Sequence, residues 1–176
     1  MARAKVAVRG TVSGVGRVLR ERSPGTKIIL TEPENAALIG SELKQDRHSD
    51  NTPATSHSSW NPHLIQGWTP DFIPFVLQEA IDNNYFDKLL PVSGEQGITW
   101  AKRLARAEGI ITGISGGSTF AIAMEVAKDA PPDSNILCML PDTGERYLSS
   151  PLFEEIPEEM TDDEKKISLS TPNYQL

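Results

Sequence analysis

The sequence predicts an α/β fold in which a mostly parallel sheet is covered by helices on both faces, a three-layer αβα arrangement. Short apolar runs alternate along the chain with segments of helical periodicity. The apolar runs are nearly continuous, as in strands buried on both faces, and glycine-rich turns follow some of them. A chain of 176 residues with 38% hydrophobic content is long enough for one core, so we expect a single domain.

The first elements are expected to be a helix and a strand. Ser23-Pro24-Gly25 is a turn signal, and the run at 27–30 after it is apolar and of strand length. Four residues before the turn recur at helical spacing: Val12, Val15, Val18 and Leu19. The segment at 34–41 is compatible with a short second helix.

A long polar loop is expected next, at 43–62, because this stretch is rich in Ser, Asn, Asp, His and Pro and has no periodicity. His48, His57 and His63 lie in or beside it, without a partnering cysteine and without helical spacing. We therefore predict solvent-exposed loop histidines and no metal site.

In the middle of the chain, the sequence pattern predicts a helix, a strand and another helix. Thr69 or Asp71 is a candidate N-cap for a helix with Pro74 in its first turn. A strand is expected at 87–92. Ser93 then caps a helix that ends at a glycine, Gly109.

The last part of the predicted fold holds two more strands. The run at 110–114 is apolar and β-branched, and the glycine cluster at 113–117 is expected to form a turn into a helix at 120–127. A buried strand follows at 135–140. The acidic tail at 154–176 shows no apolar stripe, so we expect it to pack loosely.

Composition and charge restrict the kinds of partner and the compartment that we expect for the chain. The 17 basic and 24 acidic residues give a net charge of -7, which disfavours binding to nucleic acid or to anionic membranes. No apolar run approaches the roughly 20 residues of a membrane-spanning helix. The single cysteine, Cys138, fits a reducing compartment. We expect a cytoplasmic protein, while the acid-free first 20 residues leave an organellar form open.

Two glycine clusters are candidate ligand sites because they are placed at helix starts. The segment at 113–119 holds glycines and hydroxyl side chains that can converge on a polar ligand. Ordinary turns and N-caps have the same composition, and this alternative stays open. The cluster at 9–16 matches neither a P-loop nor a dinucleotide fingerprint.

Five segments together resemble the cysteine synthases, in order and in spacing, from Gly10 to Phe153. They are Gly10-Thr11-Val12-Ser13-Gly14-Val15-Gly16-Arg17, Glu32-Pro33, Ile65-Gln66-Gly67 with Phe72-Ile73-Pro74, the stretch at 109–117, and Leu140-Pro141-Asp142-Thr143-Gly144-Glu145-Arg146-Tyr147-Leu148-Ser149. The resemblance implies the C-terminal half of a fold type II pyridoxal-phosphate enzyme of the tryptophan-synthase-β-like group, at 10–153.

The resemblance also implies a chemistry and a set of site residues. Relatives make L-cysteine from O-acetylserine and sulfide, using the cofactor as an electron sink. By matching positions, Ser115 would face the pyridine nitrogen as a neutral hydroxyl, which would leave that nitrogen largely unprotonated. Gly10 and Thr11 would remain from the phosphate loop. A strip of three residues would line the substrate pocket: Gln66, Gly67 and Trp68. Many relatives have smaller residues at this strip, so Trp68 leaves the precise amino-acid substrate open.

The sequence departs from the family pattern in its first nine residues. Ala7, Val8 and Arg9 stand where the family has the rest of a Gly-Thr-Gly-Gly-Thr loop, so we treat 1–9 as atypical and expect weaker phosphate binding. The Ser-x-Lys segment that carries the imine lysine has no counterpart in these residues. The run Lys44-Gln45-Asp46-Arg47 lies in the polar loop and is a poor candidate for that lysine.

Two interpretations remain open. In the first, the chain is half of a cysteine synthase, or of a related β-replacing enzyme such as a cystathionine β-synthase. Another chain or a missing N-terminal segment would then supply the lysine. The expected protein partners are the missing N-terminal half or a homodimer mate. In the second, it is a non-catalytic interaction module, for example for serine acetyltransferase, which binds intact family members. Two interpretations also stay open for Asp142, Glu145 and Arg146: a catalytic role, or a buried ion pair that braces the turn after the last strand.

Overall fold

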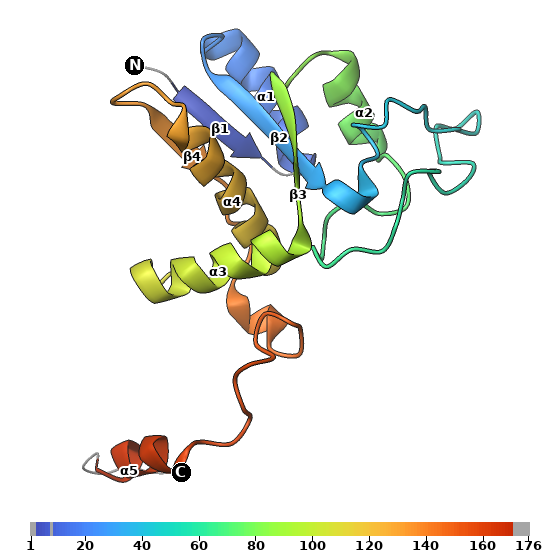
Figure 1. Cartoon of the computed structure of the whole chain (residues 1–176). Coiled ribbons are helices and arrows are strands. Elements are labelled where there is room, and N and C mark those ends of the chain that lie inside the picture. The colour runs from blue at the N-terminus through green and yellow to red at the C-terminus, as the bar shows by residue number, and fades with distance from the viewer. Residues whose placement is uncertain (1–2, 8, 171–176) are drawn as a thin grey trace.

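The computed structural model describes residues 3–7 and 9–170, with side chains from Thr11 onward. Four strands form one all-parallel sheet in the order β3-β2-β1-β4. Their bounds are β1 Arg3–Ala7, β2 Lys27–Pro33, β3 Lys88–Val92 and β4 Asn135–Cys138. Figure 1 shows the four strands side by side. The predicted α/β class with a parallel sheet is confirmed.

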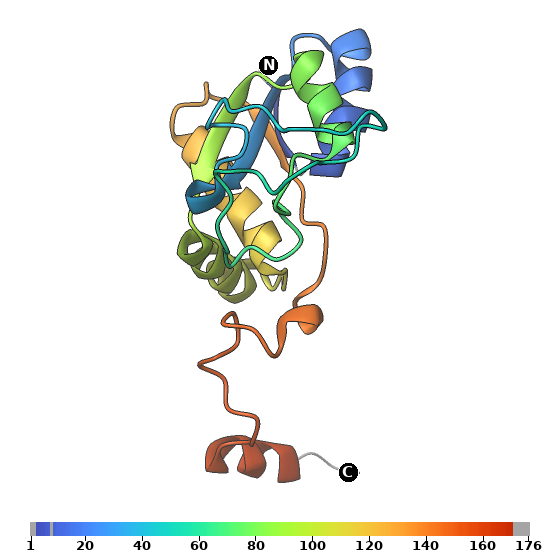
Figure 2. The same ribbon diagram turned by 90° about the vertical axis from the view of Figure 1, so that its right-hand side faces the viewer.

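Helices cover the two faces of the sheet because successive residues of a strand point to opposite sides. Ile28 and Leu30 of β2 pack in one apolar cluster with α1 (Arg9–Arg22) and α2 (Phe75–Asp82). Ile29, between them, packs in the other cluster with α3 (Gly94–Glu108) and α4 (Ile114–Lys128). The result is the expected three-layer arrangement (Figures 1 and 2).

Strand β1 lies in the interior of the sheet, although the sequence signal for it is weak. Its five residues include two cations, and they precede the segments that carry the family resemblance. Backbone pairing with β2 on one side and β4 on the other places it between them. The atypical first residues therefore contribute a strand to the fold.

The helix at 94–108 agrees with the prediction at both ends. Ser93 accepts a hydrogen bond from the Gln96 backbone, and the Gln96 side chain accepts one from the Ser93 backbone, a complete capping box. Gly109 ends the helix in the left-handed conformation, with φ of 69°.

Three expected elements are different in the structure. The predicted strand at 110–114 is absent: Ile110 and Ile111 are exposed, and helix α4 begins at Ile114 inside the predicted turn. The expected helix at 34–41 is only the short 3-10 turn Glu34–Ala36. Neither Thr69 nor Asp71 caps α2, whose N-cap position is Pro74.

The long loop packs more tightly than its composition predicts. His57 is only 4% exposed, so the expectation of exposed histidines is wrong for this residue. Its ring nitrogens lie within hydrogen-bond distance of the Leu43 carbonyl and the Ser59 amide, 3.2 Å in each case. Polar groups that can find partners within the loop can be buried at modest cost.

The acidic tail contains one helix that the sequence analysis missed, α5 (Asp162–Leu169). Thr161 and Glu164 form a capping box at its start, and none of its residues is buried. Figures 1 and 2 both show it away from the sheet and its helices. A local cap signal can start a helix where no apolar stripe docks it.

Candidate functional site

The carboxyl ends of the four parallel strands lie at one edge of the sheet, where ligands bind in open α/β folds. Helix α1 starts two residues after β1 ends, and α3 starts two residues after β3 ends. Helix α4 starts in the same region. Thr112, just before α4, forms an isolated antiparallel bridge with Thr143 in the turn after β4. Three helix N-termini therefore gather at this edge.

The start of α1 has the features of an anion site. Its first turn contains no acidic residue, and the half-buried Thr11 lies within that turn. The first N–H groups of a helix lack intrahelical acceptors, and the helix dipole favours negative charge there. The backbone places Gly10 in the same turn. A phosphate group is the chemistry that fits this donor set.

The start of α4 is fixed to the turn after β4 by a cluster of hydrogen bonds around Asp142. The Tyr147 hydroxyl donates to Asp142 Oδ2, and the Ser115 hydroxyl donates to Asp142 Oδ1 at 3.4 Å. Thr112 Oγ1 donates to the Asp142 backbone carbonyl at 3.1 Å. Ser115 and Tyr147 are almost fully buried.

Tyr147 stays neutral in this cluster at ordinary pH. Burial raises the pKa of its hydroxyl, and the hydrogen bond to the Asp142 carboxylate raises the pKa further. A neutral tyrosine can donate its proton to Asp142, which fixes the direction of that hydrogen bond.

The expected buried ion pair after the last strand is not formed. Glu145 and Arg146 are exposed, and the partner of Asp142 is Tyr147. Glu145 is hydrogen-bonded by Thr143, which lowers the pKa of its carboxyl. The sequence analysis expected charged partners for Asp142, and the structure shows that its partner is the hydroxyl of Tyr147.

The glycines at the start of α4 allow close packing between parts of the protein itself. A side chain at Gly113 would overlap the Tyr147 ring, one at Gly116 would overlap Thr112, and one at Gly117 would overlap the backbone of α3 at Gly97. The hydroxyls of Ser118 and Thr119 return to carbonyls one turn earlier in the helix. The glycines, Ser118 and Thr119 are thus occupied by contacts within the protein. Ser115 can face a ligand if its hydroxyl turns away from Asp142.

The predicted substrate strip is split between surface and core. Gln66 and Gly67 are exposed, and Gly67 has a φ of +79°. Trp68 is buried in the cluster that also contains Ile114 and Tyr147, which connects the strip to the start of α4. Its indole Nε1 is buried without a hydrogen-bond partner, and so is the hydroxyl of Thr69. Buried donors of this kind are uncommon, and a ligand or water would satisfy them.

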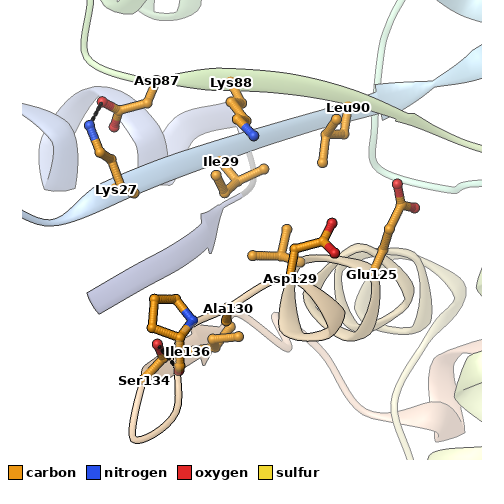
Figure 3. A pocket seen from close by; sticks show the side chains of 12 residues that line it. Lys27, Ile29, Asp87, Lys88, Leu90, Glu125, Asp129, Ala130, Ser134 and Ile136 are labelled. Carbon is orange, nitrogen blue, oxygen red and sulfur yellow. Dashed lines mark hydrogen bonds and ion pairs between the residues drawn. The ribbon is translucent and has the colours of Figure 1, made fainter. Parts of the chain in front are cut away.

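A large cavity lies elsewhere in the molecule. It has a volume of about 520 Å³ and opens between β2, β3 and the C-terminal end of α4, as Figure 3 shows. Lys27 and Lys88 on its rim belong to the amino ends of their strands. It is therefore at the opposite end of the sheet from the three helix starts.

Metal-binding clusters of three or more His, Cys, Asp or Glu side chains are not found among residues whose placement is described. No described helix is long and apolar enough to cross a membrane.

Comparison with known proteins gives a consistent result. A family model described as pyridoxal-phosphate-dependent enzyme matches residues 4–142. An O-ureido-L-serine synthase from Streptomyces lavendulae is 39% identical over 162 residues, which are 92% of this chain and 44% of that protein. A cysteine synthase from Staphylococcus aureus is 33% identical over 150 residues, 85% of this chain and 42% of that protein.

A solved structure agrees with these sequence matches. The crystal structure of an O-ureido-L-serine synthase superposes with a TM-score of 0.75 at 36% identity, covering 96% of this chain and 48% of that one. The chain thus spans less than half the length of the relatives it matches. The match begins at residue 4, six residues before the motifs that carried the resemblance.

Proposed function

The chain belongs to the pyridoxal-phosphate-dependent enzyme family, and we propose that it is the C-terminal portion of a cysteine synthase of that family. Such an enzyme makes L-cysteine from O-acetylserine and sulfide by replacing acetate at the β-carbon. The family match over residues 4–142 carries the proposal, because it spans both glycine-rich helix starts at the carboxyl edge of the sheet. The 33% identity to a Staphylococcus aureus cysteine synthase supports this reaction.

Pyridoxal phosphate is the cofactor of the family, and the residues present fit it at two places. The first turn of α1, with Gly10 and Thr11, would hold the phosphate through backbone N–H groups and one hydroxyl. Ser115, at the start of α4, would face the pyridine nitrogen. When bound, the cofactor supplies an electron sink for charge that develops on the substrate.

Asp142 competes with the cofactor ring for the hydrogen bond of the Ser115 hydroxyl. In the structure the Ser115 hydroxyl donates to the Asp142 carboxylate. Ser115 would have to turn this hydroxyl toward the ring to donate a hydrogen bond there. Gln66, Gly67 and Trp68 would line the substrate side, where the unpartnered Trp68 Nε1 can donate to a substrate oxygen.

The lysine that holds the cofactor would come from outside these 176 residues. The chain matches 44% of the Streptomyces lavendulae protein, and we call the unmatched remainder of that protein the complementary part. A separate chain that carries this part is the alternative source, because a homodimer mate would lack the same lysine. Serine acetyltransferase would be the partner if the chain serves as a binding module instead.

The test is to assay the purified chain alone and mixed with the complementary part, with pyridoxal phosphate, O-acetylserine and sulfide present. We expect cysteine to form only in the mixture. Cysteine formed by the chain alone would show that one of its own lysines holds the cofactor. No cysteine in either sample, despite a stable mixed complex, would favour the non-catalytic interaction module.

A matched pair of variants tests the phosphate site in the same mixture. Thr11→Val keeps the side-chain shape and removes the hydroxyl, so cofactor affinity measured by equilibrium dialysis should fall about tenfold, as for the loss of a charge-assisted hydrogen bond. Thr99→Val, at an exposed position of α3, is the control and should leave affinity unchanged. Equal affinity for both variants would place the phosphate elsewhere.

A second candidate is the synthesis of O-ureido-L-serine. The Streptomyces lavendulae relative is more similar to this chain than the cysteine synthase quoted, at 39% against 33% identity. Trp68, at a position where smaller residues are expected, is compatible with a different incoming nucleophile. Supplying hydroxyurea and sulfide together to the mixture, and identifying the product by mass spectrometry, decides between the two reactions.

A further inference from the structure

The carboxylate of Asp142 lies between two buried hydroxyl groups. Ser115, at the start of α4, donates to Asp142 Oδ1 at 3.4 Å, and Tyr147 donates to Oδ2 of the same carboxylate. Ser115 is 3% exposed and Tyr147 is 5% exposed, so little water competes for either hydroxyl proton. The proton of Ser115 is therefore directed to Asp142.

The direction of this hydrogen bond decides what Ser115 can offer a ligand. A serine hydroxyl has one proton to donate and two lone pairs that accept. While its proton points to Asp142, Ser115 can only accept. A hydrogen bond to a carboxylate is roughly twice as strong as one to a neutral acceptor, so a neutral pyridine nitrogen does not win the proton of Ser115. The 3.4 Å separation is long, and contacts of this kind tighten in an occupied site.

We propose that Asp142 is a positioning residue that acts on the cofactor ring through Ser115, an inference that rests on the cofactor site proposed above. Asp142 holds the proton of Ser115, and Ser115 accepts a hydrogen bond from the pyridine nitrogen. To donate that bond, the nitrogen carries a proton taken from solvent. The resemblance to cysteine synthases taken alone implied the reverse, a neutral hydroxyl beside an unprotonated nitrogen.

The charges around Ser115 favour a proton on the ring. The start of α4 disfavours it, because a helix N-terminus carries roughly half an elementary positive charge. The carboxylate of Asp142 carries one full negative charge and is hydrogen-bonded to Ser115 itself. The first turn of α4 contains no acidic residue. Glu95, Glu145 and Arg146, on the neighbouring elements, are exposed, where water and salt screen them. Asp142 is thus the dominant charge at this position.

The protonation state of the ring nitrogen can be measured directly. The chain is mixed with the complementary part and loaded with pyridoxal phosphate that carries nitrogen-15 in its ring. Protonation moves the nitrogen-15 resonance far upfield, so an NMR titration gives the midpoint. We expect a protonated nitrogen in the wild-type mixture at pH 7. An unprotonated nitrogen there would overturn the proposal without any variant.

A matched pair of variants assigns the effect to Asp142. Asp142→Asn keeps the shape and removes the charge, so the titration midpoint of the ring nitrogen should fall by about one pH unit, the low end for a neighbouring opposite charge. Glu145→Gln removes one negative charge from the same turn at an exposed position and should leave the midpoint unchanged. Equal falls in both variants would show that only net charge matters and would overturn the proposal.

Tyr147 reports on the same cluster without the cofactor. Burial raises the pKa of its hydroxyl, and the Asp142 carboxylate raises it further, against smaller lowering effects of Ser115 and Arg146. In the chain alone, Asp142→Asn should lower this pKa, measured by NMR of carbon-13-labelled tyrosine with Tyr147→Phe to identify the signal. An unchanged pKa in folded Asp142→Asn would overturn the proposal. If this variant fails to fold, the wild-type nitrogen resonance still decides.

Two outcomes separate this inference from the proposed function. A mixture that binds no pyridoxal phosphate in equilibrium dialysis would overturn both. A mixture that binds the cofactor and makes cysteine, but whose ring nitrogen is unprotonated at pH 7, would overturn only the role of Asp142.

Discussion

Helices α1 and α4 lie on opposite faces of the sheet and are held in place by different contacts. Near the end of α1, Arg20 forms an ion pair of 3.0 Å with Asp87 and also donates to the Asn84 and Thr26 carbonyls. Helix α4 is fixed at its start, by Asp142 and by close packing of its glycines.

The start of α1 contacts α2 through the Ser13 hydroxyl, which donates to the Val76 carbonyl, and its first turn has no acidic residue, which suits a phosphate. The start of α4 is closely packed against the protein itself.

The difference shows that two glycine-rich helix starts with similar composition can have different physical roles. At α1, a side chain added at Gly14 would meet open space, whereas one at Gly16, on the side that faces Tyr85, would overlap a neighbour. At α4, side chains added at Gly113, Gly116 or Gly117 would each overlap other parts of the protein. Composition alone predicts the same ligand role for both clusters, and only packing separates them.

Gly117→Ala, at the closely packed start of α4, should have the largest effect on stability of the four substitutions considered. The new methyl group would overlap the Gly97 carbonyl and the Ala101 backbone of α3, which cannot move independently of the helix. We expect the free energy of unfolding to fall by about 3 kcal/mol, the upper end of typical overpacking costs. Urea unfolding followed by circular dichroism measures it. A loss below about 1 kcal/mol would mean that α3 and α4 can slide apart.

Tyr147→Phe tests the hydrogen bonds around Asp142. It keeps the ring against Gly113 and removes the donor to Asp142 Oδ2. Because one oxygen of a half-buried carboxylate loses its partner, we expect a loss of about 1–2 kcal/mol in the same urea experiment. An unchanged midpoint would show that water replaces the hydroxyl at no cost.

Asp87→Asn tests the fixed end of α1 and should act through charge. Burial pushes the pKa of Asp87 up, but hydrogen bonds from the Ile28 amide, Arg20 and Lys27 outweigh it and lower the pKa below the ordinary 3.8. A lowered pKa stabilises the fold above that value, and the contribution is lost as the pH falls through the pKa of the folded state.

We therefore expect Asp87→Asn to cost about 1 kcal/mol at pH 7, with the difference from wild type shrinking below about pH 4. Urea unfolding at pH 7, 5 and 3 measures this dependence. A difference of the same size at pH 3 would assign the effect to hydrogen-bond geometry and not to charge.

Gly14→Ala should have the smallest effect and the opposite sign. Gly14 lies inside α1 with open space at the Cβ position, so alanine should raise the free energy of unfolding by about 0.5–1 kcal/mol. Thermal unfolding of the two proteins compares them. Destabilisation instead would reveal a contact at this position that the glycine permits.

Sequence signals predicted helix boundaries well where a few neighbouring residues determine them. Ser93 and Gly109 bound α3 because capping depends on a few neighbouring residues. The parallel sheet followed from the alternation of elements. Strand β1 was not expected, because five residues with two charges carry little periodicity and are held by strands far away in sequence. The apolar stretch at 110–114 failed as a strand because no neighbouring strand pairs with it there.

The candidate site was predicted only in outline. Matching motifs placed Gly10, Thr11 and Ser115 at helix starts, and the structure puts them there. The partners that determine what Ser115 can do, Asp142 and Tyr147, lie about 30 residues later in the chain. No spacing rule connects residues so far apart. The burial of His57 and Trp68 was hidden for the same reason, since it depends on how the loop folds back.

The pairing of β1 with β4 has a consequence for how the chain is made. Residues 3–6 pair with residues 135–138, so about 130 residues are synthesised between the central strand and its second neighbour. At cellular rates of translation this interval is on the order of ten seconds. In that time β2 can pair with β1, and β3 with β2, but the other side of β1 stays open until β4 has been synthesised. A chaperone that shields this side during elongation would protect the nascent chain when it is most prone to mispairing.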